Sequence, residues 1–345
     1  MKNKFFNRAA QEKWEEENLS FYACKSKESK GREKREIFCP LRTEFQRDRD
    51  RIIHSKSFRR LEHKTQVFIA PFGDHYRTRL THTLEVGQIA RTVSRALRLN
   101  EDLTEAIALG HDLGHTPFGH TGEEALNEVY QGGFSHNQQS LRVVEKLEGK
   151  GGLNLTWEVR DGIFNHSQEG EAILDTETSY VPHTLEAEVV KLADPLAYVN
   201  HDIDDALRAG LIKKNNLPCQ PIKVLGETHR ERISTLVEDI VSSSYGKSHL
   251  EMSEDILKSF NDLRSFMYGK VYQCDILLKE VEKAHLLIGS LYKFYLKNPQ
   301  FLPDNFKKNA GENGISQVVV DYIAGMTDRY AIKEYEKYFL PQGWG

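Results

Sequence analysis

The chain has 345 residues, of which 39% are hydrophobic and 28% are charged, and its formal net charge is −4. This length predicts one large globular domain or two ordinary ones, and the composition excludes an intrinsically disordered chain. The nearly neutral charge argues against bulk electrostatic binding to nucleic acid or to an anionic membrane, and leaves room only for a local basic patch.

Four cysteines are scattered along the sequence with no CxxC pair. Scattered cysteines are typical of free thiols in a reducing compartment, not of a disulfide framework or a thiolate zinc site. No apolar run approaches the length of a membrane span, and the basic N-terminus lacks the apolar stretch of a signal peptide. We therefore expect a cytoplasmic protein that does not insert into a membrane.

Hydrophobic residues recur with helical periodicity along the chain, without a convincing alternating strand or repeat, which predicts an all-α fold. Residues 1–44 are polar and predict a surface arm with a short helix over residues 9–17. Residues 45–212 carry most of the chemically informative side chains. Residues 213–345 predict a C-terminal helical region that packs on this core and returns to the site near residues 318–331.

A strongly basic stretch occupies residues 47–68, with the sequence RDRDRIIHSKSFRRLEHKTQVF. It is consistent either with a salt-bridged helix surface or with a set of cations that faces an anionic ligand. In the second interpretation Lys64 supplies a cation and Gln66 a hydrogen-bonding group. Residues 71–74, PFGD, then predict a turn.

The next helix is predicted to begin with Thr81 as its N-cap, which places His82 in the first turn and Arg79 just before it. A second helix runs from Leu103 into residues 111–120, HDLGHTPFGH. We expect the Thr-Pro-Phe-Gly turn to end it, and two further helices to begin at His120 and after Ser135.

A long helix is predicted over residues 184–206, with Asp194, Tyr198 and Asp202 spaced four residues apart on one face. Pro195 lies inside this helix, where a proline costs about 3 kcal/mol. We expect a kink there that aims Asp194 inward.

Eleven of the fourteen histidines lie between His54 and His201. Core packing alone does not cluster a residue that costs energy to bury when charged, so this segment suggests a site. Neutral imidazole and carboxylate are ligands of divalent ions. Four such residues lie near ends of separate helices or at the proline, and they predict a site for Mn, Mg, Fe, Ni or Zn: His82, His111, Asp112 and Asp194. The alternative is that these four side chains are ordinary core residues whose polar atoms are paired by hydrogen bonds.

The neighbouring side chains suit metal-assisted hydrolysis of a phosphoester. Arg79 and Lys64 are cations that can bind phosphate, and His120 and His136 can carry protons near neutral pH. Glu123 lies one helical turn after His120 and can orient it. The sequence has no P-loop, HExxH, GxSxG or GxGxxG motif that points to another chemistry.

The order His82, His111-Asp112, Asp194 resembles the HD-domain metal phosphohydrolases. Several stretches are similar to one branch, the bacterial deoxynucleoside triphosphate triphosphohydrolases, which include dGTPases and dGTPase-like proteins. These stretches are residues 47–55, 58–68, 79–86 (RLTHTLEV), 111–120, 200–206 (NHDIDDA) and 321–328 (DYIAGMTD). The similarity is densest over residues 45–210 and reappears at residues 318–331.

The resemblance implies an HD-domain helical bundle with a metal site between helices and additional C-terminal helices. It implies cleavage of a deoxynucleoside triphosphate at the α-phosphorus to a deoxynucleoside and tripolyphosphate. The implied roles are a metal set of His82, His111, Asp112 and Asp194; an acid–base group of His120, Glu123 and His136; phosphate contacts from Arg79 and His115; and a sugar pocket of Gln66, Tyr198 and Asp202. It also implies a homo-oligomer, such as a dimer of dimers or a hexamer, and in some members a nucleotide effector.

One position departs from the family pattern. Related enzymes often have a basic residue directly after the metal aspartate, and this chain has Pro195. Two other functions remain to be separated by experiment. One is an HD nucleotidase or phosphodiesterase that acts on monophosphates. The other is a non-catalytic regulator that binds nucleotides or nucleic acid.

Overall fold

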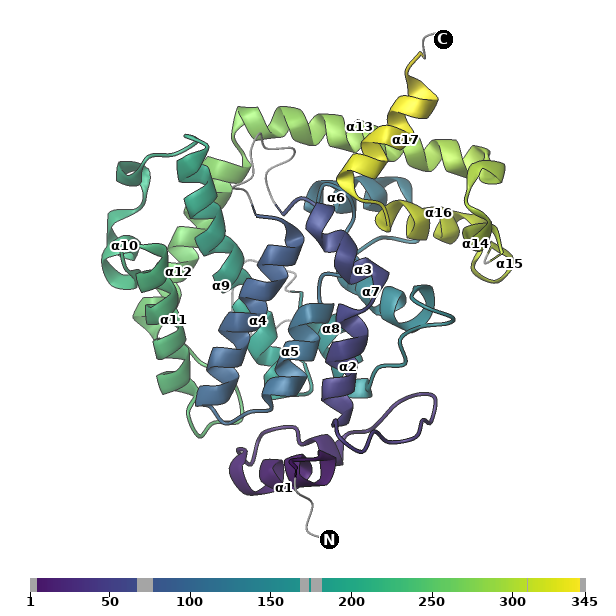
Figure 1. The fold of residues 1–345 in the computed structure, drawn as a ribbon. Coiled ribbons are helices and arrows are strands. Elements are labelled where there is room, and N and C mark those ends of the chain that lie inside the picture. Colours follow the sequence, from purple (N-terminus) through teal and green to yellow (C-terminus); the bar gives the residue numbers. More distant parts are fainter. Residues whose placement is uncertain (1–4, 67–76, 168–173, 175–181, 309, 342–345) are drawn as a thin grey trace.

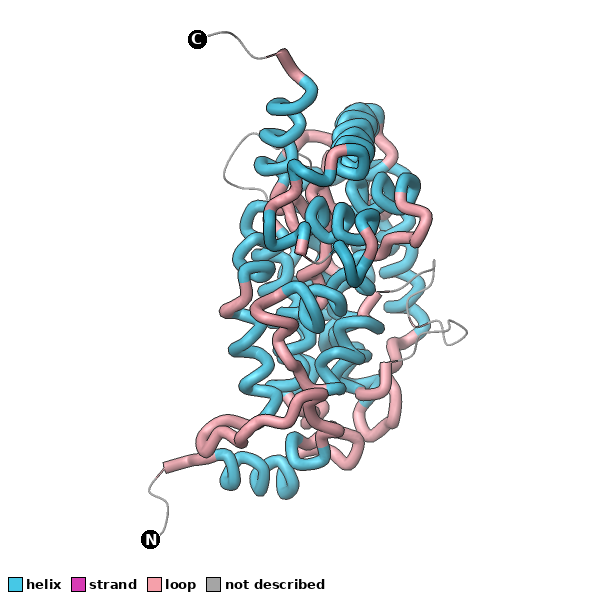
Figure 2. Tube along the Cα trace, turned by 90° about the vertical axis from the view of Figure 1, so that its right-hand side faces the viewer, coloured by secondary structure: helices cyan, strands magenta, loops and turns pink. Residues whose placement is uncertain are grey.

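The computed structural model describes residues 5–66, 77–167, 174, 182–308 and 310–341. Over these residues the regular structure is helical, and β contacts are limited to two isolated bridges, Arg32–Thr156 and Thr65–Thr78. Figure 2 shows the described chain as helices joined by loops. The predicted all-α fold is confirmed. The turn predicted at residues 71–74, together with Val67 and Phe68, lies outside the described residues.

The α-helices follow one another along the chain, with long connections after α1, α3 and α8. Their bounds are α1 (Arg8–Asn18), α2 (Glu44–Ile53), α3 (Lys56–Arg60), α4 (Arg79–Ala96), α5 (Glu101–Gly110), α6 (His120–Val129), α7 (His136–Arg142), α8 (Trp157–Asn165), α9 (Leu185–Arg208), α10 (Cys219–Leu225), α11 (His229–Ser244), α12 (Glu254–Met267), α13 (Asp275–Lys297), α14 (Asp304–Lys307), α15 (Ala310–Asn313), α16 (Ile315–Ala324) and α17 (Asp328–Phe339). No helix in the described part of the chain is both long and apolar enough to cross a bilayer.

Helix α5 lies at the centre of the molecule, where it contacts α2, α4, α8 and α9 (Figure 1). Its apolar residues Leu103 and Ile107 are fully buried, as are Val86 of α4 and Leu196 of α9. A Cβ atom on Gly162 of α8 would lie only 2.5 Å from Ile107, so α8 approaches α5 as closely as glycine permits. This packing brings the C-terminal ends of α5 and α8 together.

A second apolar cluster joins α6 to the C-terminal helices α13, α16 and α17, which lie across the top of Figure 1. Leu126, Ile288, Leu291 and Ile323 are fully buried within it. The first cluster draws on residues from Ala23 to Val271, on both sides of position 212. The domain boundaries at residues 44 and 212 stay predictions.

The N-terminus of α4 differs from the prediction. Thr78, not Thr81, is the N-cap: the Thr78 side chain accepts a hydrogen bond from the Thr81 amide. The Thr81 hydroxyl reciprocates by accepting from the Thr78 amide at 3.1 Å, which completes a capping box and adds the preceding turn to the helix. Arg79 is therefore the first residue of α4, and His82 still lies near its start.

Glu186, in the first turn of α9, connects three parts of the fold. Its Oε1 accepts hydrogen bonds of 2.9 Å from the backbone amides of Cys24 and Asn100, and the residue is completely buried. Burial raises the pKa of Glu186 to about 7, although these amides lower it. The unfolded chain has a glutamate pKa of about 4.3. The folded chain therefore holds this proton more tightly, so the stability it contributes is present below about pH 4.3 and is lost as the pH rises through 7.

We expect Glu186→Gln to flatten this part of the pH dependence of stability. Glutamine keeps an acceptor oxygen for the two amides but has no charge to desolvate. The wild-type decline between about pH 4.3 and 7, at most about 4 kcal/mol, should therefore be missing. Urea unfolding at pH 5 and pH 8 measures the difference. Glu17→Gln, at an exposed position, is the control. An unchanged pH slope in Glu186→Gln would show that Glu186 does not contribute it.

Candidate active site

Four side chains from three helical segments lie together beside the end of α5. His82 comes from α4, His111 and Asp112 follow α5, and Asp194 comes from the middle of α9. The potential ligand atoms of His82, His111 and Asp112 all lie within 4.8 Å of one another. His82 Nε2 is 3.0 Å from Asp194 Oδ1, which adds the fourth member. Residues that are far apart in the sequence are thus brought into one group, in which His82, His111 and Asp112 are buried and Asp194 is partly exposed.

The protonation of His111 shows that this group fits a divalent ion. His111 Nδ1 lies 2.6 Å from the Ala108 carbonyl oxygen, which places the ring proton on Nδ1. Its Nε2 is buried without a hydrogen-bond partner and lies 3.4 Å from Asp112 Oδ1. A ring lone pair that faces a carboxylate needs a cation between them, and a carbonyl that orients the opposite nitrogen is typical of metal-binding histidine.

Arg79 is the guanidinium next to this group. Its Nη1 donates to Asp112 Oδ2 at 2.7 Å, and the residue is 1% exposed. Burial raises the pKa of Asp112, but its contacts with His111 and with the guanidinium of Arg79 outweigh burial and hold this pKa well below its usual value. The Nε and Nη2 donors of Arg79 are buried and have no hydrogen-bond partner among the described residues. A buried donor without a partner costs about 1–3 kcal/mol, so these two N–H groups point to an anionic ligand.

A second group of side chains surrounds Glu123 on α6. Glu123 contacts His120 Nδ1 at 3.0 Å and His136 Nδ1 at 2.9 Å, and it accepts the backbone amide of His136 at 2.7 Å. Ser135 holds the N-cap position of α7 as predicted but makes no side-chain capping bond; the Gln138 amide donates to Asn137 Oδ1 instead. The His115 ring stacks on His136 with centroids 4.0 Å apart. This second group therefore adjoins Asp112, which lies 3.3 Å from His115.

The electrostatics of the second group favour an ionised Glu123 and a cationic His120. Burial alone would raise the pKa of Glu123, but the charge of His136 and the hydrogen bonds of both histidines lower it well below its usual value. Desolvation lowers the pKa of His120, whereas its hydrogen bond and charge interaction with Glu123 outweigh that effect and raise it. The His120 side chain is 67% exposed. It can therefore deliver a proton to a molecule that enters from solvent.

Gly119 ends the loop between the two groups in a conformation that side chains rarely adopt, with φ +60° and ψ −133°. A Cβ atom there would lie 2.9 Å from Arg79 Nη2 and 3.1 Å from the Gln66 carbonyl oxygen. We expect Gly119→Ala to destabilise the fold by roughly 1–3 kcal/mol, through backbone strain and this crowding. Urea unfolding measures the loss. Gly269→Ala, where a Cβ meets open space, should cost nothing, and equal stabilities of the two variants would contradict the prediction.

Of the predicted sugar-pocket residues, Tyr198 and Asp202 lie on α9, and Gln66 lies beside Gly119. Asp202 is buried and accepts a hydrogen bond of 2.5 Å from the Tyr272 hydroxyl, and burial raises the pKa of Asp202 to about 7. Burial likewise raises the pKa of Tyr198 to about 12. The Gln66 Oε1 atom is buried and has no hydrogen-bond partner in the described part of the chain. The roles of these residues stay predictions.

Lys64 belongs to neither the metal-binding group nor the Glu123 group, and it lies beside the chain at His115. Its Nζ donates to the backbone carbonyls of His115 and of Ala324, the latter at 2.8 Å. Burial lowers the pKa of Lys64 to about 7. These contacts give Lys64 a structural position that connects the loop to α16, and its predicted contact with substrate stays untested.

The C-terminal segment near residues 318–331 contacts the turn at residues 116–119. Asp328 Oδ1 accepts the Phe118 amide at 3.0 Å, and Oδ2 accepts the Thr65 amide at 2.9 Å. Asp321 forms a bidentate pair with Arg142, the last residue of α7, with two contacts of 2.7 Å. The segment therefore supports the turn that separates the two groups.

Sequence reasoning missed two residues that the structure places at the site. His166 directly follows α8, and its Nε2 atom lies 3.1 Å from His136 Nε2. Tyr272 donates a hydrogen bond from its hydroxyl to Asp202. His166 belongs to the histidine-rich segment and follows a helix end, which was the available signal. Tyr272 carried no signal, because only packing brings it to α9.

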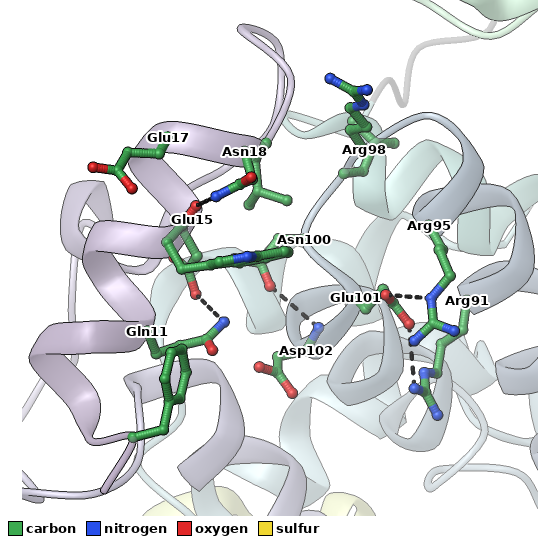
Figure 3. Close-up of a pocket in the computed structure, with 14 residues that line it drawn as sticks. Gln11, Glu15, Glu17, Asn18, Arg91, Arg95, Arg98, Asn100, Glu101 and Asp102 are labelled. Atoms are coloured by element: carbon green, nitrogen blue, oxygen red, sulfur yellow. Dashed lines mark hydrogen bonds and ion pairs between the residues drawn. The ribbon is translucent and has the colours of Figure 1, made fainter. Parts of the chain in front are cut away.

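Two large cavities lie outside the histidine groups. One, of about 700 Å³, lies between α1 and the corner of α4 and α5, where Arg91 and Arg95 both contact Glu101 (Figure 3). None of the predicted site residues lines it. The other, of about 860 Å³, is lined by Lys64 and several cations of the basic stretch, including Arg51, Arg59 and Arg60.

Comparisons with known proteins agree with this arrangement. A family model described as HD domain matches residues 79–199, and one described as phosphohydrolase-associated domain matches residues 250–337. A deoxyguanosinetriphosphate triphosphohydrolase-like protein of Caldanaerobacter subterraneus subsp. tengcongensis is 56% identical over 327 residues, which cover 94% of each chain. A protein of the same name from Desulfatibacillum aliphaticivorans is 49% identical and covers 96% of this chain and 98% of its own.

A further protein of that name, from Clostridium perfringens strain 13, is 49% identical over 337 residues and covers 96% of this chain and 97% of its own. The matches span the metal group, the Glu123 group and the C-terminal support in one chain. The chain thus belongs to the deoxyguanosinetriphosphate triphosphohydrolase-like family of HD-domain phosphohydrolases.

Proposed function

We propose that the protein hydrolyses deoxynucleoside triphosphates, dGTP or several dNTPs, at the α-phosphorus to a deoxynucleoside and tripolyphosphate. The observation that carries the proposal is the buried Arg79, whose two unmatched N–H groups lie beside a divalent-ion site. A polyanion that binds this ion can also satisfy Arg79, and the names of the relatives point to a triphosphate.

The proposed roles follow from the two groups of side chains. His82, His111, Asp112 and Asp194 hold the ion, which when bound polarises the phosphoryl group and lowers the pKa of water. Arg79 and His115 contact phosphate oxygens. These contacts orient the α-phosphorus toward the Glu123 group.

The Glu123 group moves the proton. Glu123 raises the pKa of His120 and so favours its cationic form, from which His120 can protonate the leaving 5′-oxygen at its exposed position. Glu123 also holds His136 through both the ring and the backbone amide. A single carboxylate therefore fixes both imidazoles relative to the scissile bond.

Gln66, Tyr198 and Asp202 are proposed to line the deoxyribose pocket. Asp202 is already bonded to Tyr272, which limits its freedom to accept a further hydroxyl. A 2′-hydroxyl against the Tyr198 ring would clash or remain unpaired, and a site that leaves a hydroxyl unpaired discriminates against it. Pro195 supplies no charge next to Asp194, so Arg79 carries the phosphate contact at this side of the site.

Product analysis separates the proposed function from its alternatives. The protein, loaded with Mn²⁺ or Mg²⁺, is incubated with each dNTP, and the products are resolved by ion-exchange chromatography. Tripolyphosphate release supports the proposal, and the matching ribonucleotides serve as controls for the sugar pocket. Orthophosphate released from deoxynucleoside monophosphates, with dNTPs intact, would indicate a nucleotidase. Binding of dNTPs without any cleavage over hours would indicate a regulator.

The same protein sample can be used to test the proposed oligomeric state. We propose a homo-oligomer, a dimer of dimers or a hexamer, which some nucleotides stabilise as effectors. Light scattering coupled to gel filtration, with and without each dNTP, gives the mass. A monomeric mass under every condition would contradict this part of the proposal.

A further inference from the structure

Asp328, the first residue of α17, has a carboxylate next to the site that the proposed reaction does not use. Its Oδ1 accepts a hydrogen bond from the Phe118 amide at 3.0 Å. Its Oδ2 accepts one from the Thr65 amide at 2.9 Å and another from the Thr65 hydroxyl. A carboxylate forms stronger hydrogen bonds than a neutral acceptor does. One side chain of the C-terminal helices therefore joins two segments that are far apart in the sequence.

The first of these segments leads into the proposed proton donor. Phe118 and Gly119 have φ angles of +62° and +60°, and His120 follows them as the first residue of α6. A side chain rarely adopts a positive φ, so the backbone at Phe118 needs support from its surroundings. The Phe118 ring is buried against the C-terminal helices, and its amide donates to Asp328. The direction in which the chain enters His120 depends on these contacts.

The second segment leads into the proposed phosphate contact. Thr65 forms an isolated β-bridge with Thr78, which is the N-cap of α4. The Arg79 amide donates to the Lys64 carbonyl oxygen at 3.2 Å. The segment at Thr65 therefore fixes the start of α4, from which Arg79 extends to Asp112.

We propose that Asp328 is a positioning residue, which fixes His120 relative to Arg79 through the backbone of the two segments. The inference rests on the proposed function for the roles of these two residues. In that reaction water attacks the α-phosphorus, the bond to the 5′-oxygen breaks, and His120 gives its proton to that oxygen. The proton donor and the phosphate contact lie on α6 and α4, and Asp328 connects the starts of both helices from a third element.

Kinetics of Asp328→Ala test this role. We expect kcat for dGTP to fall by about 10–10²-fold, because a displacement of about 1 Å at a reacting group costs about 10²-fold. KM should change by less than about threefold, because Arg79 keeps its bond to Asp112. The alkaline limb of the kcat profile should stay at the wild-type pH, since Glu123 still contacts His120. A wild-type kcat, or a KM that rises as much as kcat falls, would overturn the proposal.

Hydrogen exchange followed by mass spectrometry separates local displacement from general destabilisation. In Asp328→Ala, peptides that cover residues 62–66 and 116–120 should exchange about tenfold faster, because both amides lose a charged acceptor. Peptides of α5 should exchange as in the wild type. Faster exchange along the whole chain, or no change in either segment, would overturn the positioning role. If Asp328→Ala is unstable, Asp328→Asn keeps the size and one acceptor oxygen, and at least one of the two peptides should exchange faster.

Asp304→Asn is the control, because its side chain is 89% exposed and its ion-pair contact is Lys307 at 3.2 Å. It should match the wild type in kcat, KM and exchange. A wild-type protein that released no tripolyphosphate from dGTP would contradict the proposed function. The exchange measurement would then still decide whether Asp328 holds the two segments, so the two failures are distinguishable.

Discussion

The variant Asp194→Ala is expected to lose the ion bound by His82, His111 and Asp112, together with at least about 10³-fold of the hydrolytic rate. Asp194 Oδ1 lies 3.0 Å from His82 Nε2, and α9 supplies no other carboxylate to this group in the described residues. A divalent ion contributes several kcal/mol to stabilising charge at phosphorus, and about 4 kcal/mol corresponds to a factor near 10³. Tripolyphosphate release and metal content, measured on the same sample, test both parts.

Asp204→Ala is the matched control for this variant. Asp204 lies on the same helix, its side chain is 28% exposed, and its ion-pair contact is Arg232 at 3.7 Å. The control should keep metal and activity. If Asp194→Ala remained active with the ion still bound by His82, His111 and Asp112, the assignment of Asp194 as a ligand would be wrong.

The variant Glu123→Gln is expected to lower kcat by about 10²–10⁴-fold, which is the usual contribution of general acid–base catalysis. The amide removes the negative charge that raises the pKa of His120 and that contacts both ring nitrogens. Because the folded pKa of His120 then falls, the protonated form is lost at lower pH. The alkaline limb of the kcat profile should move to lower pH, while KM changes less than kcat. A pH series from 5 to 9 measures both effects.

Glu124→Gln is the control for Glu123→Gln. Glu124 is the next residue of α6, but its side chain is 70% exposed and points to His285 at 3.8 Å. It should have wild-type kcat and the wild-type pH profile. An unshifted alkaline limb in Glu123→Gln would show that Glu123 does not set the proton affinity of His120.

Local patterns in the sequence predicted the helices well, because an amphipathic stripe and a capping residue are local features. The helix that begins at His120 and the long helix around Asp194 are both present. The N-cap of α4 was misplaced by three residues. Thr78 and Thr81 are equally plausible caps on composition, and the reciprocal bonds between them determine which one is used.

For the site residues, too, local sequence patterns indicated some features and could not indicate others. The motif at residues 111–120 indicated the chemistry because imidazole and carboxylate side chains gather in it. Lys64 is predicted to contact phosphate, and this prediction stays untested; in the structure its Nζ donates to two backbone carbonyls that come from distant parts of the chain. A lysine has the same side chain in either position, so composition could not separate a ligand from a structural contact.

By itself the sequence determined the helical class, the family resemblance and the residue types able to bind a metal ion and phosphate. Only the tertiary structure decided which of them meet: Asp194 with His82, Glu123 with two histidines, and His166 with His136. The physical reason is that the use of an imidazole depends on its proton, and the proton lies on the nitrogen that faces a carbonyl or a carboxylate. Those partners come from the packing of α5, α6 and α8, which no local pattern specifies.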